Sequence, residues 1–156
     1  MRIASSFGST IVRNIARSTV ARAAALAIAT AAATGAAPAM ADEGPEIFTH
    51  NGSLMEVFIH ADEVTISYAR PKSSLRRLGV RPGTVLFQGG YTRNGIAGTA
   101  YVFRSGCQPA GYAVSGPDLR GQGIVLSGAA PVRPKGSCRV TGYTRNSGNA
   151  RLEFWR

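Results

Sequence analysis

Residues 84–107, TVLFQGGYTRNGIAGTAYVFRSGC, constrain the fold of this chain more than any other stretch. Two short β-prone runs, 85–87 and 96–103, flank Asn94-Gly95, a pair that tolerates the positive φ angles of a type I′ turn. The segment therefore predicts a β-hairpin closed at Asn94-Gly95. Gly98 contributes no packing inside the second strand, so it indicates a bulge, a barrel corner or a close backbone approach, and a curled sheet.

The same pattern of short strands and tight turns continues on both sides of this hairpin. Asn51-Gly52 predicts a second type I′ hairpin, between 47–50 and 53–60. Because residues 54–59 are apolar on both faces, we expect the second arm to lie deep in the sheet. Further strands are expected at 64–68, 112–115, 124–127, 140–143 and 151–155, with Leu152 and Phe154 on one face of the last and Arg151, Glu153 and Trp155 on the other.

A single helical signal occurs after residue 41. In 72–79 a serine can cap the start, Leu75 and Leu78 share a face, and Gly79 can end the turn. Residues 128–137, with two prolines, are expected as loop. Eight or nine short strands with turns between them predict an all-β fold, a small antiparallel barrel or a compact sandwich with at most one short helical turn. The abundance of glycine favours the barrel.

The first 41 residues have the composition of a cleavable signal peptide. Four arginines and no acidic residue precede an apolar, alanine-rich run at 23–37, and Ala39-Met40-Ala41 forms a cleavage site before Asp42. A mitochondrial transit peptide is the alternative. The run of about 15 residues is shorter than the roughly 20 of a membrane span, so no transmembrane anchor is expected. This interpretation predicts a periplasmic or secreted protein, with a flexible lead-in at 42–46 and one small β domain at 47–156.

Cys107 and Cys138 are the only two cysteines. In an oxidising compartment such a pair predicts a disulfide, which would stabilise the fold by roughly 3 to 4 kcal/mol in the chain-entropy model. Free thiols, a metal site or a nucleophilic cysteine are the alternatives. Two cysteines with the distant His50 and His60 make a weak metal-ligand set. Neither a metal site nor a cofactor is therefore expected.

Charge is distributed unevenly along the chain. After residue 41 there are fourteen Lys and Arg residues against eight Asp and Glu residues, and all fourteen lie beyond residue 63, where only Asp118 and Glu153 are acidic. Arginine pairs with carboxylates and phosphates, so the expected partner is an anionic envelope component or an envelope protein. The alternative is a solvated surface without a ligand. Tyrosines beside arginines can also stack on bases, but the leader argues against nucleic acid. Nothing in the sequence indicates the oligomeric state.

The pentapeptide Gly-Tyr-Thr-Arg-Asn occurs twice, at 90–94 and 142–146. One interpretation is a turn solution used twice, and the other is a pair of equivalent loops that contact a ligand. Trp155 lies outward by alternation and is expected either to anchor a partner or to fold over the barrel's end. The candidate ligand-binding residues are Tyr91, Arg93, Tyr143, Arg145 and Trp155.

Catalytic residues are not predicted. A Ser-His-acid set can be drawn from Ser53, His50 and either Glu56 or Asp62, but Ser53 directly follows a hairpin turn and no nucleophile elbow is present. Turn capping and strand register account for these residues. We therefore expect that the protein is not an enzyme.

Several short motifs carry a resemblance: His50-Asn51-Gly52-Ser53-x-Met55, Pro82-Gly83-Thr84-x-x-Phe87-x-Gly89, and the run from Gly98 to Cys107 with the second cysteine at 138. Together they resemble a group of uncharacterised short secreted proteins of alphaproteobacteria, and a C-terminal module of some caspase-like peptidase chains. The likeness covers most of 48–155. It implies a periplasmic or extracellular accessory or binding domain. It does not imply peptidase activity, because the Gln-Ala-Cys-x-Gly motif of caspases is absent.

These observations predict a non-catalytic binding or accessory domain of the bacterial envelope that recognises an anionic ligand or protein. The alternative function is an inhibitor or regulatory partner of an envelope hydrolase or peptidase.

Overall fold

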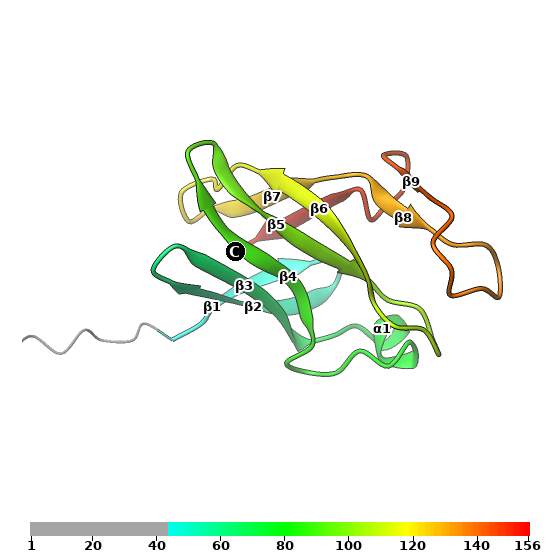
Figure 1. Cartoon of the computed structure of the whole chain (residues 1–156). Coiled ribbons are helices and arrows are strands. Elements are labelled where there is room, and N and C mark those ends of the chain that lie inside the picture. The colour runs from blue at the N-terminus through cyan, green and yellow to red at the C-terminus, as the bar shows by residue number, and fades with distance from the viewer. Residues whose placement is uncertain (1–43) are drawn as a thin grey trace, which may run out of the picture. The chain divides into compact units, whose positions relative to one another are not determined.

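A computed structural model of the chain describes residues 44–156, so the predicted signal peptide and the first residues of the lead-in lie outside the described part. The described residues form an all-β fold around a closed barrel of eight antiparallel strands (Figure 1). The prediction of a small antiparallel barrel with one disulfide, Cys107–Cys138, is confirmed. The helix found in this part is a single short piece, α1 (Ser73–Arg77). No helix within residues 44–156 is long and apolar enough to cross a membrane.

The barrel strands follow one another as a meander, and β10 closes the barrel against β1. A two-stranded sheet, β8–β9, is inserted between β7 and β10 and lies outside the barrel (Figure 1). The bounds are β1 (Glu46–His50), β2 (Ser53–His60), β3 (Glu63–Arg70), β4 (Val85–Thr92), β5 (Gly95–Val102), β6 (Ala110–Gly116), β7 (Gly123–Ser127), β8 (Ala130–Val132), β9 (Gly142–Thr144) and β10 (Arg151–Trp155).

Inward-facing side chains alternate with outward-facing ones along each strand, and the inward-facing ones fill the barrel interior, as is usual for a barrel of eight strands. On β10, Leu152 and Phe154 are buried and Arg151 and Trp155 are exposed, as the sequence predicted. The largest fully buried apolar side chains are Phe87, Phe154, Met55, Ile66, Ile96, Leu126, Val57, Val64 and Val80.

The central hairpin forms as predicted, with β4 and β5 paired in continuous register and Gly89 opposite Gly98. Gly98 marks a close approach, because a Cβ atom there would lie 2.5 Å from the Gly89 Cα atom and 2.8 Å from the Phe87 Cζ atom. The ring of Phe87, which is fully buried, thus occupies the space that two side chains would need. The glycine pair lets the hairpin curve around this ring.

The predicted turn type at this hairpin is wrong. Thr92 pairs with Gly95, so Arg93 and Asn94 form the loop, and of these residues only Gly95 has a positive φ angle. The Asn94 amide donates to the Thr92 hydroxyl (3.2 Å), a local bond that shapes the turn without positive φ at Asn94. At the first hairpin the prediction is confirmed, since Asn51 and Gly52 have φ angles of 47° and 77°.

Burial at the end of β2 also differs from the prediction. Phe58 and Ile59 are 46% and 45% exposed, although the strand was expected to lie deep in the sheet. The reason is the register: β1 begins at Glu46, opposite Val57, so the residues after Val57 have a partner strand only on the β3 side. Because Glu46 belongs to β1, the sheet begins within the predicted lead-in.

Two local predictions, the serine cap of the helix and the bounds of the strands after residue 127, are wrong. Both concern exposed segments, whose sequences show no alternation of apolar and polar residues. The residue at the start of α1 is Lys72, without a side-chain capping bond, rather than a serine. Within the expected loop 128–137, residues 130–132 form the strand β8. Its partner β9 begins at residue 142, two residues later than the predicted strand 140–143. Few side chains of β8 and β9 are buried, so neither segment shows apolar alternation.

We expect Gly98→Ala to lower the free energy of unfolding by about 1–3 kcal/mol, because the added methyl group must displace backbone atoms of β4 and the Phe87 ring. Urea denaturation followed by circular dichroism measures this change. Gly148→Ala is the matched control, since nothing lies within 4 Å of a Cβ atom there and its φ angle is not positive. Equal stabilities of the two variants would contradict the close approach.

Candidate functional site

A groove of about 990 Å³ lies on the outer face of the barrel over β5 and β6. Its floor consists of the small residues that alternate with the buried side chains of these strands: Ala97, Thr99, Gly111, Ala113 and Ser115. Residues 127–129 form part of its wall, and Tyr143 and Arg145 complete it. Because the floor carries only small side chains, a ligand can approach the sheet closely.

Tyr143 and Arg145 reach the groove through the β8–β9 sheet. Tyr143 pairs with Pro131 across this sheet, and its side chain is 61% exposed. The chain turns just after β9, where the Asn146 amide donates to the Thr144 hydroxyl (3.1 Å). The groove therefore has a flat aromatic face and an exposed guanidinium group, the features for which these two residues were singled out.

The first copy of the pentapeptide does not line this groove. Its Asn94 amide donates to Thr92 just as Asn146 donates to Thr144, so the two copies share this local bond, but only the first copy closes a two-residue hairpin turn. The Tyr91 hydroxyl donates to Asp118 (2.8 Å), and burial together with this bond raises the pKa of Tyr91 to about 12. Arg93 is exposed at the β4–β5 turn. The five predicted residues are thus not brought to one site.

Trp155 lies on the outer face of β10, opposite Gly123 of β7 and Thr49 of β1. A Cβ atom on Gly123 would lie 2.5 Å from the Trp155 Cε3 atom, so the ring packs across this glycine. It remains 41% exposed and does not line the groove.

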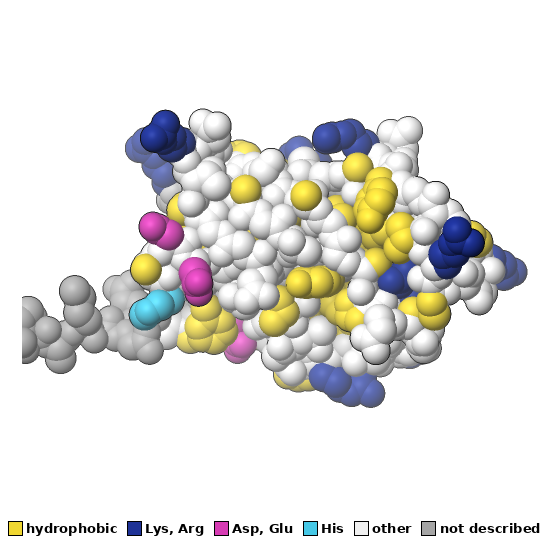
Figure 2. All heavy atoms as spheres, in the orientation of Figure 1, with side chains coloured by type: hydrophobic (Ala, Val, Ile, Leu, Met, Phe, Trp, Pro, Cys, Tyr) yellow, Lys and Arg dark blue, Asp and Glu magenta, His cyan; other side chains and the backbone are white. Residues whose placement is uncertain are grey.

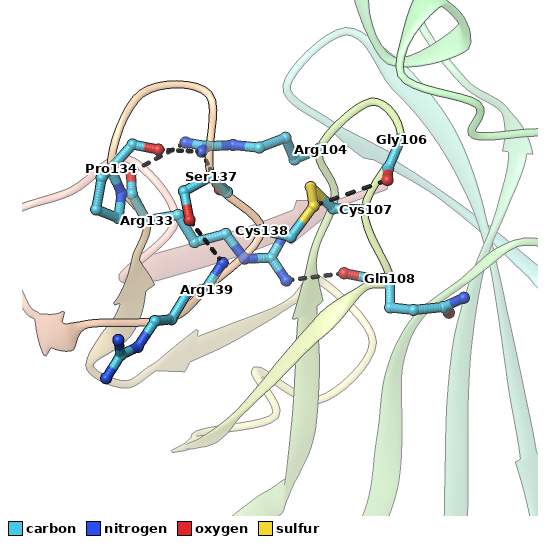
Figure 3. Close-up of a disulfide and its surroundings, with 9 residues drawn as sticks. All are labelled: Arg104, Gly106, Cys107, Gln108, Arg133, Pro134, Ser137, Cys138 and Arg139. Atoms are coloured by element: carbon cyan, nitrogen blue, oxygen red, sulfur yellow. Dashed lines mark hydrogen bonds between the residues drawn. A yellow bond between two sulfur atoms is a disulfide. The ribbon is translucent and has the colours of Figure 1, made fainter.

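The disulfide fastens the loop after β8 to the loop between β5 and β6 (Figure 3). Arg104 supports this connection, since its guanidinium donates to the carbonyl groups of Pro134 (2.6 Å), Ser137 (2.7 Å) and Arg133 (3.1 Å). Arg133 in turn donates to the Gln108 carbonyl (2.8 Å). Arg104 and Arg133 therefore bind backbone carbonyl groups. The sequence did not predict this role, and the one available signal was that Arg104 lies close to Cys107 in the chain.

His50 and Ser53 take part in the barrel rather than facing each other as base and nucleophile. The His50 Nδ1 atom lies 2.8 Å from the Glu153 carbonyl oxygen, and the ring stacks on Phe154 at 4.8 Å. Because a carbonyl only accepts, Nδ1 carries the proton. The Ser53 hydroxyl accepts the Lys72 amide (3.0 Å). Within residues 44–156 no three His, Cys, Asp or Glu side chains gather as metal ligands.

The uneven charge of the sequence is visible on the molecular surface. Figure 2 shows the acidic side chains near the end where β1 begins, and the Lys and Arg side chains at the loop tips and around the other end. Arg151 pairs with Glu153 and Arg156 with Glu46. Both are exposed pairs that contribute little to stability.

Comparison of the chain with family models, curated proteins and solved structures gives no match to any of them. The arrangement of residues is therefore the basis for a functional proposal.

We expect Arg104→Lys to accelerate hydrogen exchange in 133–138 and to lower the free energy of unfolding by roughly 1–3 kcal/mol, since an ammonium group cannot reproduce the planar set of three bonds. Arg139→Lys is the control, because only the backbone amide of Arg139 bonds to this loop, at Ser137. Unchanged exchange in Arg104→Lys would show that the disulfide alone orders the loop.

His50 predicts a pH dependence of stability. Burial, the largest effect on this group, lowers its pKa below the usual 6.5 despite the bond to the Glu153 carbonyl, and Lys72 lowers it further. As the pH falls below about 6.5, the unfolded chain takes up a proton that the folded barrel resists, so stability decreases toward lower pH. In His50→Gln this slope should disappear, whereas exposed His60→Gln should retain it. Urea midpoints between pH 5 and 8 measure it, and a retained slope in His50→Gln would contradict this origin.

Proposed function

We propose that the chain is a non-catalytic binding module of the bacterial envelope that holds an anionic ligand in the groove over β5 and β6. The observation that carries this proposal is the joint placement of Tyr143 and Arg145 on the wall of that groove. An arginine side chain pairs with a carboxylate or phosphate through two parallel hydrogen bonds. The exposed Tyr143 ring offers a flat surface for an apolar or sugar ring beside it.

The surrounding surface supports an anionic ligand. Most of the acidic side chains lie before residue 64, and the excess of arginine after it produces a field that attracts anions and accelerates their encounter. Arg104 and Arg133 are engaged with backbone carbonyls, whereas Arg145 is exposed and lines the groove.

The disulfide and the leader composition support a location outside the cytoplasm. Disulfides persist in oxidising compartments and are rare in the cytosol. Cys107 and Cys138 are bonded in the folded domain, and 1–41 has the pattern of an export signal.

A second candidate function is an inhibitor or regulatory partner of an envelope hydrolase or peptidase. It is favoured by three large apolar side chains that the neighbouring strands β10, β1 and β2 leave exposed: Trp155 at 41%, Ile47 at 50% and Phe58 at 46%. Exposed apolar surface of this kind marks protein contacts when it is continuous.

Arg145→Ala should weaken binding of soluble anionic peptidoglycan fragments or lipopolysaccharide by about tenfold, because one charge-assisted contact is lost. Tyr143→Ala should weaken it as well. Isothermal titration at two salt concentrations measures both. Arg93→Ala is the matched control, since it occupies the same place in the other copy of the pentapeptide and does not line the groove.

The control also separates the alternatives. Equal losses in Arg145→Ala and Arg93→Ala would show a general electrostatic tether and contradict a groove site. Wild-type affinity in Arg145→Ala and Tyr143→Ala would exclude the groove. A stoichiometric complex with an envelope hydrolase that is lost in Trp155→Ala and kept in Arg145→Ala would select the second function.

A further inference from the structure

A more enclosed cavity lies at the end of the barrel next to α1 and has a volume of about 210 Å³. The buried side chains of Leu86, Leu152 and Tyr112 line it from the barrel, and Leu75 and Leu78 line it from α1 and the residue that follows. The Lys72 amide donates to the Ser53 hydroxyl and so connects this segment to β2, and the Val80 amide donates to the Leu75 carbonyl within the segment. Eight-stranded barrels are wide enough to hold one small ligand, and barrel mouths are common ligand sites.

The cavity is lined by a tyrosine hydroxyl group that bonds to no other group of the described residues. Tyr68 is 3% exposed as a residue, but its hydroxyl is not one of the fully buried atoms without a partner, so it keeps accessible surface toward the cavity. The neighbouring Tyr112, in contrast, donates to the Asn149 carbonyl. Burial raises the pKa of Tyr68 and of Tyr112 to about 12, so both hydroxyls remain protonated at neutral pH. The Tyr68 hydroxyl is therefore free to donate to a water molecule or a ligand that occupies the cavity.

Two further polar groups define the chemistry of the cavity. Lys72 lines it with an exposed, positively charged side chain that pairs with no acid among residues 44–156. His50 bonds through Nδ1 to the Glu153 carbonyl, so its Nε2 atom is unprotonated, 3.3 Å from the Asn51 amide nitrogen. The cavity therefore offers two donors, Tyr68 and Lys72, that have no acceptor of their own. The rest of the lining is mostly apolar.

We propose that this cavity binds a small monocarboxylic acid with an apolar body, such as a single aromatic ring or a short alkyl chain. The carboxylate accepts hydrogen bonds from the Tyr68 hydroxyl and the Lys72 ammonium group, and the body packs against Leu86, Val102 and Leu152. The volume corresponds to about seven water molecules at roughly 30 Å³ each, which limits the ligand to this size.

This site is separate from the groove of the proposed function. Tyr112 is the one residue that lines both, through opposite sides of β6. Binding in the cavity does not require Arg145 or Tyr143, so either proposal can fail without the other.

Titration of the ¹⁵N-labelled protein with benzoate, and with hexanoate as a second acid, tests the proposal by NMR. We expect saturable shifts of the amides near residues 50, 68, 72 and 112. Benzamide, which has the same shape without the charge, should bind more weakly. Tyr68→Phe, which keeps the buried ring, and Lys72→Gln, at an exposed position, should each weaken benzoate binding by about tenfold.

Tyr91→Phe is the matched control, because it removes a hydroxyl that donates to Asp118 outside the cavity, and it should bind benzoate as the wild type does. Arg145→Ala should also leave this binding unchanged. Three results would each overturn the proposal: no saturable shift with either acid, which would show a cavity that holds water only; equal binding of benzamide; or full affinity in Tyr68→Phe with an unchanged spectrum.

Discussion

The packing of Phe87 against a facing pair of glycines sets the curvature on which the rest of the barrel depends. Gly89 and Gly98 are opposite each other in β4 and β5, and the buried Phe87 ring lies where their side chains would be. Because neither strand carries a Cβ atom at this point, the hairpin can bend around the ring.

A second constraint lies outside the barrel. The β8–β9 sheet has little core of its own, and the disulfide with the three carbonyl bonds of Arg104 connects the loop between its strands to the loop between β5 and β6. This connection places the loop after β9 beside the barrel, where Tyr143 and Arg145 line the groove. The arginines of this region thus differ in role: Arg104 binds backbone, whereas Arg145 has its charge exposed. A count of arginines cannot distinguish these roles.

The two proposed sites use different physical properties of one small barrel. The groove is open, has a floor of small side chains and presents one exposed charge, which suits part of a larger anionic ligand. The cavity is more enclosed than the groove and is lined by both apolar and polar side chains, and its Tyr68 hydroxyl and Lys72 charge suit a small acid. His50 contributes to the cavity wall while its bond to the Glu153 carbonyl and its stacking on Phe154 hold β1 against β10.

The sequence by itself determined the elements whose cause is local or periodic. Turn glycines located the hairpins at 51–52 and near 94, alternation oriented Leu152 and Phe154 inward, and an even cysteine pair predicted the disulfide. Only the tertiary structure decided what depends on register and on contacts distant in sequence. Pairing of Thr92 with Gly95 replaced the expected turn, and β1 begins opposite Val57, so Phe58 has no partner on that side. The strands β8 and β9 formed without an apolar pattern in the sequence. It also separated Tyr143 and Arg145 from Tyr91, Arg93 and Trp155. The identical pentapeptides share one local hydrogen bond, but closure of the barrel gives each of them different neighbours.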